Sequence, residues 1–170
     1  MDEKWTRTTV TLYRIARKGG LIAITGERGT GKTQSATIIA AWLLDEWRAP
    51  AEDWHGWRPQ PVRYAKAADL FAMMHAGRDD RGPRSAHRLY STCGFLVVDE
   101  YQERVDSDAE DRILTNIIDH RYDRKLPTLI ISNMTVPELQ AQLGPSVTSR
   151  IQETGRVQVF TWPSFRARTR

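Results

Sequence analysis

Short apolar runs alternate along this chain with longer segments in which apolar residues recur at helical spacing. Five runs predict strands, at residues 21–25, 62–65, 95–98, 128–132 and 157–161. The third and fourth runs are continuously apolar, which is typical of strands that are buried on both faces. Alternation of strands and helices indicates a parallel sheet with helices on both sides, so we expect a three-layer α/β fold with five parallel strands.

The predicted helices lie between these strands. The first begins near Lys32, and its inward face is expected to carry Ala36, Ile39, Ala40, Leu43, Leu44 and Trp47. Further helices are expected at residues 68–75, 85–91 and 108–121. Thr135 and Glu138 have the spacing of a capping box, so another helix should begin there, continue to about Leu143 and end at Gly144-Pro145.

A phosphate-binding pattern follows the first predicted strand. Residues 26–33 read GERGTGKT and fit G-x-x-x-x-G-K-[ST], directly before a predicted helix. Glycines allow the loop to turn so that its N–H groups converge on phosphate, and the helix N-terminus adds positive potential. We expect Lys32 to reach the β- and γ-phosphates of ATP and the Thr33 hydroxyl to bind Mg²⁺. The expected nucleotide-binding residues are Gly26, Gly29, Thr30, Gly31, Lys32, Thr33 and Gln34.

Two carboxylates end the third predicted strand, at Asp99 and Glu100. The carboxyl edge of a parallel sheet is where ligands bind, so both side chains should face the phosphate loop. We expect Asp99 to be a Mg²⁺ partner and Glu100 to polarise the attacking water.

A polar pair, Ser132-Asn133, follows the fourth strand at the same predicted edge. Asn133 could hydrogen-bond both a γ-phosphate oxygen and the attacking water. The alternative is that Asn133 only forms a turn before the Thr135 cap.

These motifs occur in a fixed order together with Arg121-Tyr122, Pro127-Thr128, Leu143-Gly144, Thr148-Ser149-Arg150-Ile151 and Trp162-Pro163-Ser164-Phe165-Arg166. The series resembles the AAA+ core of the DnaC/IstB group, which comprises bacterial and phage helicase loaders and transposition helper ATPases. The resemblance implies that Asn133 is the sensor-1 residue. It also implies that Arg150 is an arginine finger acting in trans, so subunits would stack head to tail into a ring or spiral. Arg166 matches the group's terminal Ser-x-Arg, for which a structural ion pair is an equal alternative.

The expected organisation is an N-terminal segment at residues 1–20, an AAA+ core at 21–166 and a basic tail at 167–170. The helical lid of larger AAA+ proteins is not expected, which is typical of the group. The N-terminal segment could form an adaptor helix that contacts a partner through Trp5, Leu12 and Ile15, or it could cover the adenine, which we favour.

Composition limits the compartment and the partners. One cysteine, Cys93, excludes an internal disulfide, and no apolar stretch could span a bilayer, so we expect a cytoplasmic protein without membrane contact. The net charge of +4 permits nucleic-acid binding without demonstrating it. Candidate contacts with single-stranded DNA are Lys66, Arg78, Arg81, Arg84 and Arg88. A solvated basic face is the alternative reading of these residues.

The sequence therefore predicts an ATPase that uses ATP and Mg²⁺, assembles on single-stranded DNA and assists a replicative helicase. One alternative is an IstB-type helper that coats duplex DNA and recruits a transposase. A small P-loop kinase is a further alternative, but it leaves the carboxylate pair, Asn133 and Arg150 without a common explanation.

Overall fold

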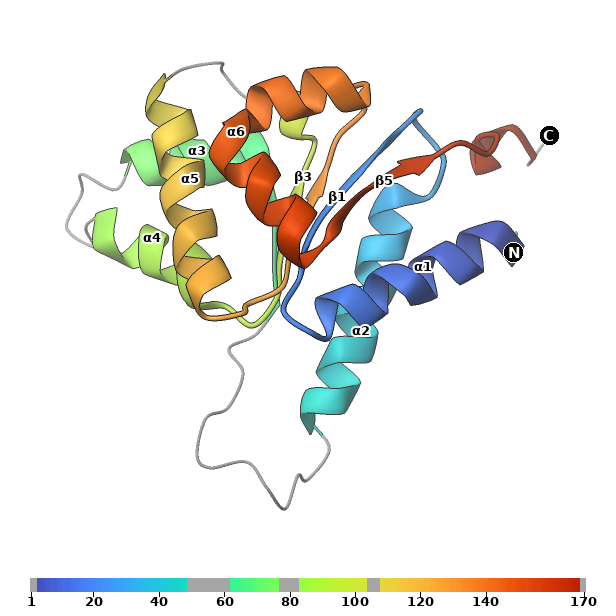
Figure 1. Cartoon of the computed structure of the whole chain (residues 1–170), viewed down its shortest axis with the longest axis horizontal. Helices are drawn as coiled ribbons and strands as arrows, with labels where there is room; N and C mark the ends of the chain where they lie inside the picture. The colour runs from blue at the N-terminus through green and yellow to red at the C-terminus, as the bar shows by residue number, and fades with distance from the viewer. Residues whose placement is uncertain (1–2, 49–61, 77–82, 104–107, 169–170) are drawn as a thin grey trace.

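The fold is built on one parallel five-stranded sheet. The computed structural model describes residues 3–48, 62–76, 83–103 and 108–168 (Figure 1). The strand order is β2-β3-β4-β1-β5, and every neighbouring pair is parallel. The strands are β1 (Leu21–Gly26), β2 (Arg63–Lys66), β3 (Leu96–Asp99), β4 (Thr128–Ile131) and β5 (Arg156–Phe160). Each agrees with its predicted range to within one residue at either end, so the predicted α/β class and the five-stranded parallel sheet are confirmed.

Helices cover both faces of this sheet (Figure 1). On one face lie α1 (Glu3–Ala16) and α2 (Lys32–Arg48); on the other lie α3 (Ala67–Ala76), α4 (Pro83–Thr92), α5 (Asp108–Asp123) and α6 (Val136–Thr154). Two short 3-10 helices complete the described elements, η1 (Tyr101–Glu103) and η2 (Phe165–Arg168). No described helix is long and apolar enough to cross a membrane.

Alternation along β1 divides the core in two. Ile22 and Ile24 pack in a cluster with residues of α1 and α2, whereas Leu21 and Ala23 belong to the cluster formed with α3 to α6. Successive side chains of a strand point to opposite faces, so a fully apolar strand feeds both layers at once. This requirement explains why the central strands are continuously hydrophobic.

The α1 helix is part of the core. Trp5, Leu12 and Ala16 are buried on the α2 side, and the Thr9 and Ser35 hydroxyls lie 2.9 Å apart between the two helices. Trp5 and Leu12, considered above as partner contacts, are therefore covered by the chain itself.

The α6 helix is bent where the sequence predicts its end. Gly144 has φ 73° and ψ 166°, outside the helical region, but helical structure resumes at once and continues to Thr154. The predicted stop at Gly144-Pro145 is therefore a bend between two helical arms, and Pro145 is tolerated because it opens the second arm. The predicted capping box is confirmed, since the Thr135 N–H donates to Glu138 Oε2 at 2.8 Å.

Arg121 is completely buried at the end of α5. Its guanidinium donates to four oxygens, at 2.7 to 2.9 Å: the carbonyls of Tyr90, Cys93 and Pro127 and the hydroxyl of Thr128. Burial lowers its pKa. The side chain thus links α5 to the segment before β3 and to the start of β4, at the edge of the sheet opposite the phosphate loop.

Candidate nucleotide-binding site

The phosphate loop connects the carboxyl end of β1 to the N-terminus of α2. Gly26, Gly29 and Gly31 have φ of 141°, 81° and 81°, values that only glycine adopts without strain. A Cβ on Gly26 would lie 2.4 Å from the Phe160 carbonyl oxygen of the neighbouring strand. The glycines of the motif are therefore required both by backbone conformation and by close packing.

A cavity of about 590 Å³ lies over this loop at the carboxyl edge of the sheet. Its size is typical of small-ligand sites. Twelve residues line it: Arg28, Gly29, Gly31, Lys32, Thr33, Gln34, Asp99, Glu100, Glu103, Asn133, Phe165 and Arg166. The structure thus brings the predicted loop residues, the carboxylate pair and Asn133 into one cavity. Gly26 and Thr30 lie in the loop behind its wall, where the buried Thr30 hydroxyl donates to the Glu27 carbonyl at 2.9 Å.

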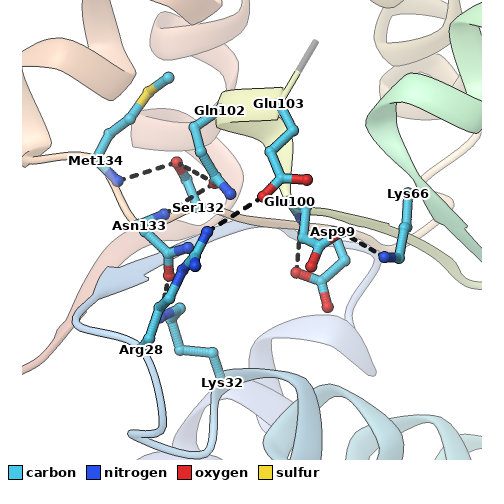
Figure 2. A network of polar contacts seen from close by, with 10 residues as sticks. All are labelled: Arg28, Lys32, Lys66, Asp99, Glu100, Gln102, Glu103, Ser132, Asn133 and Met134. Atoms are coloured by element: carbon cyan, nitrogen blue, oxygen red, sulfur yellow. Dashed lines mark hydrogen bonds and ion pairs between the residues drawn. The ribbon is translucent and has the colours of Figure 1, made fainter.

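Lys32 is buried at the base of this cavity. Its ammonium donates to the carbonyls of Gly26 at 2.7 Å and Glu27 at 2.8 Å, and to Asn133 Oδ1 at 2.7 Å (Figure 2). Burial lowers the pKa of the ammonium, and the nearby Asp99 opposes that shift. The Lys32 ammonium is thus bound by uncharged oxygens, and the cavity beside it is large enough for a triphosphate.

Thr33 and Asp99 form the acidic side of the site. The Thr33 hydroxyl donates to Asp99 Oδ2 at 2.7 Å, and the Tyr64 hydroxyl donates to the same oxygen at 2.9 Å. Burial raises the pKa of the Tyr64 hydroxyl most, and the hydrogen bond to Asp99 raises it further. Among the residues that the structure describes, no group of three or more His, Cys, Asp or Glu could hold a metal ion. One hydroxyl beside one carboxylate nevertheless fits Mg²⁺, which takes most of its remaining ligands from phosphate and water.

Glu100 follows β3 in an unusual backbone conformation. Its φ is 53°, in the left-handed region that non-glycine residues seldom adopt, and its N–H donates to Asp99 Oδ1 at 2.7 Å. Its carboxylate forms an ion pair with Lys66 at 2.8 Å, and this contact raises the pKa of Lys66 (Figure 2). Strained residues cluster at functional sites, where surrounding contacts maintain them.

Gln102 joins the ends of β3 and β4. Its Oε1 accepts hydrogen bonds from the Ser132 hydroxyl at 3.2 Å and from the Asn133 N–H at 3.0 Å (Figure 2). The Ser132 hydroxyl in turn accepts from the Met134 N–H at 3.2 Å. This network holds the Asn133 backbone, and the Asn133 side chain accepts a hydrogen bond from Lys32 at the edge of the cavity.

Arg150 does not line the cavity of its own chain. It lies on the second arm of α6, where its guanidinium forms an ion pair with Asp119 at 3.0 Å and stacks over the Tyr122 ring at 5.4 Å. Among the candidate DNA contacts, Lys66 and Arg88 are exposed. Arg78, Arg81 and the side chain of Arg84 lie outside the described residues.

The sequence interpretation missed several residues that surround the site. Arg28 and Glu103 form an ion pair at 3.3 Å across its rim. Phe165 and Arg166, which the motif series includes without a role at the site, line it from the C-terminal segment. Arg28 is inside the motif and could have been suspected. Gln102 and Tyr64 carry no local signal, because their roles depend on contacts between separate strands.

The chain was compared with known proteins by sequence and by fold. No protein-family profile matches the chain. The replicative helicase loader DnaC of Escherichia coli (strain K12) is 29% identical over 146 residues, which cover 84% of this chain and 55% of DnaC. A crystal structure of the DnaC helicase loader superposes with TM-score 0.72 at 20% identity, covering 94% of this chain and 91% of that chain. The replication initiator DnaA bound to AMPPCP and single-stranded DNA gives TM-score 0.66 at 18% identity, covering 92% and 44%.

Fold and site together define an α/β domain with a phosphate-binding loop, and it has the fold of the solved DnaC helicase loader. Within that class, the expected resemblance to the DnaC/IstB group is confirmed on the DnaC side: the chain is similar in sequence to replicative helicase loaders. It spans about half the length of the curated relatives that it matches, 55% in the case of E. coli DnaC.

Proposed function

We propose that this chain is an ATP-dependent replication helper of the DnaC kind, which binds MgATP, hydrolyses it and acts with a replicative helicase on single-stranded DNA. The observation that carries the proposal is the convergence of Lys32, Thr33, Asp99, Glu100 and Asn133 on one 590 Å³ cavity. Similarity to DnaC over 84% of the chain supports the helicase-loading role.

In this proposal each residue acts on the triphosphate by position and charge. Lys32 would exchange its contacts with the Gly26 and Glu27 carbonyls for phosphate oxygens, a gain because charge-assisted bonds are stronger. Thr33 and Asp99 would hold Mg²⁺, which when bound neutralises charge on the β- and γ-phosphates. Asn133 would orient the γ-phosphate or the attacking water from its fixed place beside Lys32.

Glu100 is the proposed group that polarises the water. Its carboxylate is paired with Lys66, so this contact must loosen before Glu100 can accept a hydrogen bond from water. Lys66 is also a candidate DNA contact, and a DNA phosphate would compete with Glu100 for it.

Arg150 is the proposed arginine finger for a neighbouring subunit. Arg150 does not line the cavity of its own chain, so it would have to act on the site of a neighbouring subunit, where a guanidinium suits the charge on a transferring phosphate. A head-to-tail contact of this kind produces rings or open spirals.

Hydrolysis is tested by comparing the wild type with Glu100→Gln. We expect the variant to bind MgATP with unchanged affinity while turnover falls by about 10² to 10⁴-fold, the usual contribution of a positioned general base. Equilibrium binding and phosphate release measure the two quantities. Equal turnover in both proteins would remove Glu100 from the mechanism.

The finger is tested by mixing subunits. Arg150→Ala should lose activity alone and regain part of it when mixed with Glu100→Gln, because each variant retains the half-site that the other lacks. Phosphate release measured across mixing ratios checks this. No recovery at any ratio counts against the intersubunit site.

DNA binding is tested by titrating single-stranded and duplex oligonucleotides with MgATP or MgADP at several salt concentrations. We expect tighter binding to single strands with MgATP and a steep loss of affinity with salt. A preference for duplex DNA would favour the transposition-helper alternative. An absence of binding in both nucleotide states would remove DNA from the proposal.

A further inference from the structure

Three consecutive carbonyls of the phosphate loop are each bound by a donor from a distant part of the chain. The Phe165 N–H donates to the Gly29 carbonyl at 2.9 Å. The indole Nε1–H of Trp162 donates to the Thr30 carbonyl at 2.8 Å. That of Trp5 donates at 3.2 Å to the Gly31 carbonyl, which also accepts from the Ser35 N–H at 2.9 Å. The donors lie on α1 and on the segment after β5, so both ends of the described chain meet at the loop.

These bonds to the carbonyls also set the direction of the N–H group in the same peptide unit. A trans peptide is planar, with its C=O and N–H pointing in opposite directions. Holding the carbonyls of Gly29, Thr30 and Gly31 away from the cavity therefore directs the N–H groups of Thr30, Gly31 and Lys32 the opposite way. Those N–H groups are the ones that a phosphate-binding loop offers to its ligand.

The donors are themselves rigidly held. Trp5 and Trp162 are 1% and 6% exposed and belong to the core cluster of the α1–α2 face. The ring of Trp162 packs on Phe160 with centroids 4.5 Å apart, and Trp5 meets Phe165 edge to face at 6.4 Å. Neither tryptophan lines the cavity, so neither is placed to touch a nucleotide in it.

The packing behind the loop leaves no room for side chains. A Cβ on Gly29 would lie 2.1 Å from Ser164 Oγ, and one on Gly31 would lie 2.8 Å from Trp5 Nε1. The two glycines thus provide the close approach that lets the donors reach the loop backbone.

We propose that Trp5 and Trp162 are positioning residues, which set the affinity for the nucleotide's phosphates by holding the loop carbonyls from behind. This inference rests on the proposed binding of MgATP. It adds that the loop is not set by its own sequence alone, but depends on two indole donors in α1 and after β5.

The test replaces each indole by a ring without a donor. Trp162→Phe and Trp5→Phe keep an aromatic group in the core but remove the N–H, and Trp42→Phe is the matched control. Trp42 packs on Tyr13 at 5.2 Å on the same face of the sheet and has no described bond to the loop. Binding of MgATP and MgADP, the KM and kcat for ATP, and the urea midpoint without nucleotide are measured for all variants.

We expect each loop variant to bind MgATP and MgADP about fivefold more weakly, the size of one neutral hydrogen bond, and the double variant to lose about 25-fold. The KM should rise while kcat at saturating ATP stays near that of the wild type. The urea midpoint should fall below that of the half-buried control Trp42→Phe, because both substitutions shrink a buried side chain and Trp162→Phe also leaves the buried Thr30 carbonyl without its donor. The nucleotide affinity of Trp42→Phe should be unchanged. A purely structural role would lower the midpoint and the active fraction but leave the KM of the folded protein at the wild-type value.

Unchanged affinity in Trp5→Phe and Trp162→Phe overturns the inference, as does an equal loss in Trp42→Phe. Should one variant fail to fold, the other decides the outcome. Wild-type protein that does not bind MgATP sinks the proposed function itself. Wild-type binding with indifferent variants sinks only the role of the two tryptophans.

Discussion

Two buried cationic side chains lie at opposite edges of the same sheet, in similar surroundings but with different access to ligands. Lys32, under the phosphate loop, and Arg121, at the end of α5, are both held by neutral oxygens rather than by carboxylates at hydrogen-bond distance. Burial is the largest cause lowering the pKa of both groups. The difference is access, because Lys32 lines a cavity whereas Arg121 has protein on every side.

This difference decides what each cation can do. In the proposed function, phosphate oxygens replace the partners of Lys32, because the cavity leaves room for a ligand beside it. The partners of Arg121 cannot be replaced without opening the core, so its hydrogen bonds contribute only to folding. A buried cation is therefore a binding group where its surroundings leave space and a structural group where they do not.

The largest expected effect follows from removing the enclosed cation. Arg121→Leu leaves the carbonyls of Tyr90, Cys93 and Pro127 without this donor, and each unsatisfied buried acceptor costs about 1–3 kcal/mol. We expect the free energy of unfolding to fall by at least about 3 kcal/mol in urea denaturation. The exposed Arg124 provides the control, since Arg124→Leu should change stability by no more than about 0.5 kcal/mol. Equal stability of the two variants would contradict the structural role of Arg121.

The cation beside the cavity should give the opposite result. Lys32→Met removes charge-assisted bonds to phosphate worth about 1.5–3 kcal/mol each, so MgATP affinity should fall about a hundredfold or more. The urea stability of the protein without added nucleotide should change by less than about 1 kcal/mol, because Lys32 lines the cavity and water can reach the carbonyls that its ammonium leaves. Calorimetric titration and urea denaturation measure the two quantities. A large loss of stability with retained binding would reverse the comparison.

The smallest expected effect is on the pH dependence of binding. In the nucleotide-free chain the pKa of Lys32 lies below 10.5, because burial disfavours the charged form. Phosphate favours that form, so the pKa rises on binding and, at alkaline pH, a proton is taken up. Affinity for MgATP should therefore fall as pH rises through the lowered pKa, by at most about tenfold per unit.

The same linkage has the opposite sign for folding. A lowered lysine pKa means that the unfolded chain binds more protons, so the contribution of Lys32 to stability improves as pH rises toward 10.5. Binding isotherms and urea midpoints at about pH 8 and pH 9.5 separate the two trends. Binding that strengthens with pH would contradict the proposed contact between Lys32 and phosphate.

Local patterns in the sequence predict much of the fold and the centre of the site. Each strand was within one residue of its observed bounds because continuous apolar runs are a local signal. The residues that line the cavity from the loop, with Asp99, Glu100 and Asn133, follow strand ends, and strand ends of a parallel sheet converge.

Features that depend on pairing between distant segments were not predictable in this way. The indole of Trp162 meets a carbonyl 132 positions earlier in the chain, and Lys66 meets Glu100 from a different strand. Arg121 could have been suspected, since it continues the inward stripe of Leu114, Ile117 and Ile118 at helical spacing. Charged residues are seldom fully buried, so an arginine at a core-facing position is normally expected to lie at the surface.

The bend at Gly144 divides α6 into two arms, and both contribute buried side chains to the same core: Leu139 and Leu143 from the first, Val147 and Ile151 from the second. The first arm begins just after Asn133, which contacts Lys32, and the second carries Arg150, which is paired with Asp119 of α5. An added Cβ at Gly144 would meet nothing within 4 Å, so only its φ of 73° demands glycine there. Because both arms pack in the same core, α6 connects Asn133, beside Lys32, to the Arg150–Asp119 ion pair on α5.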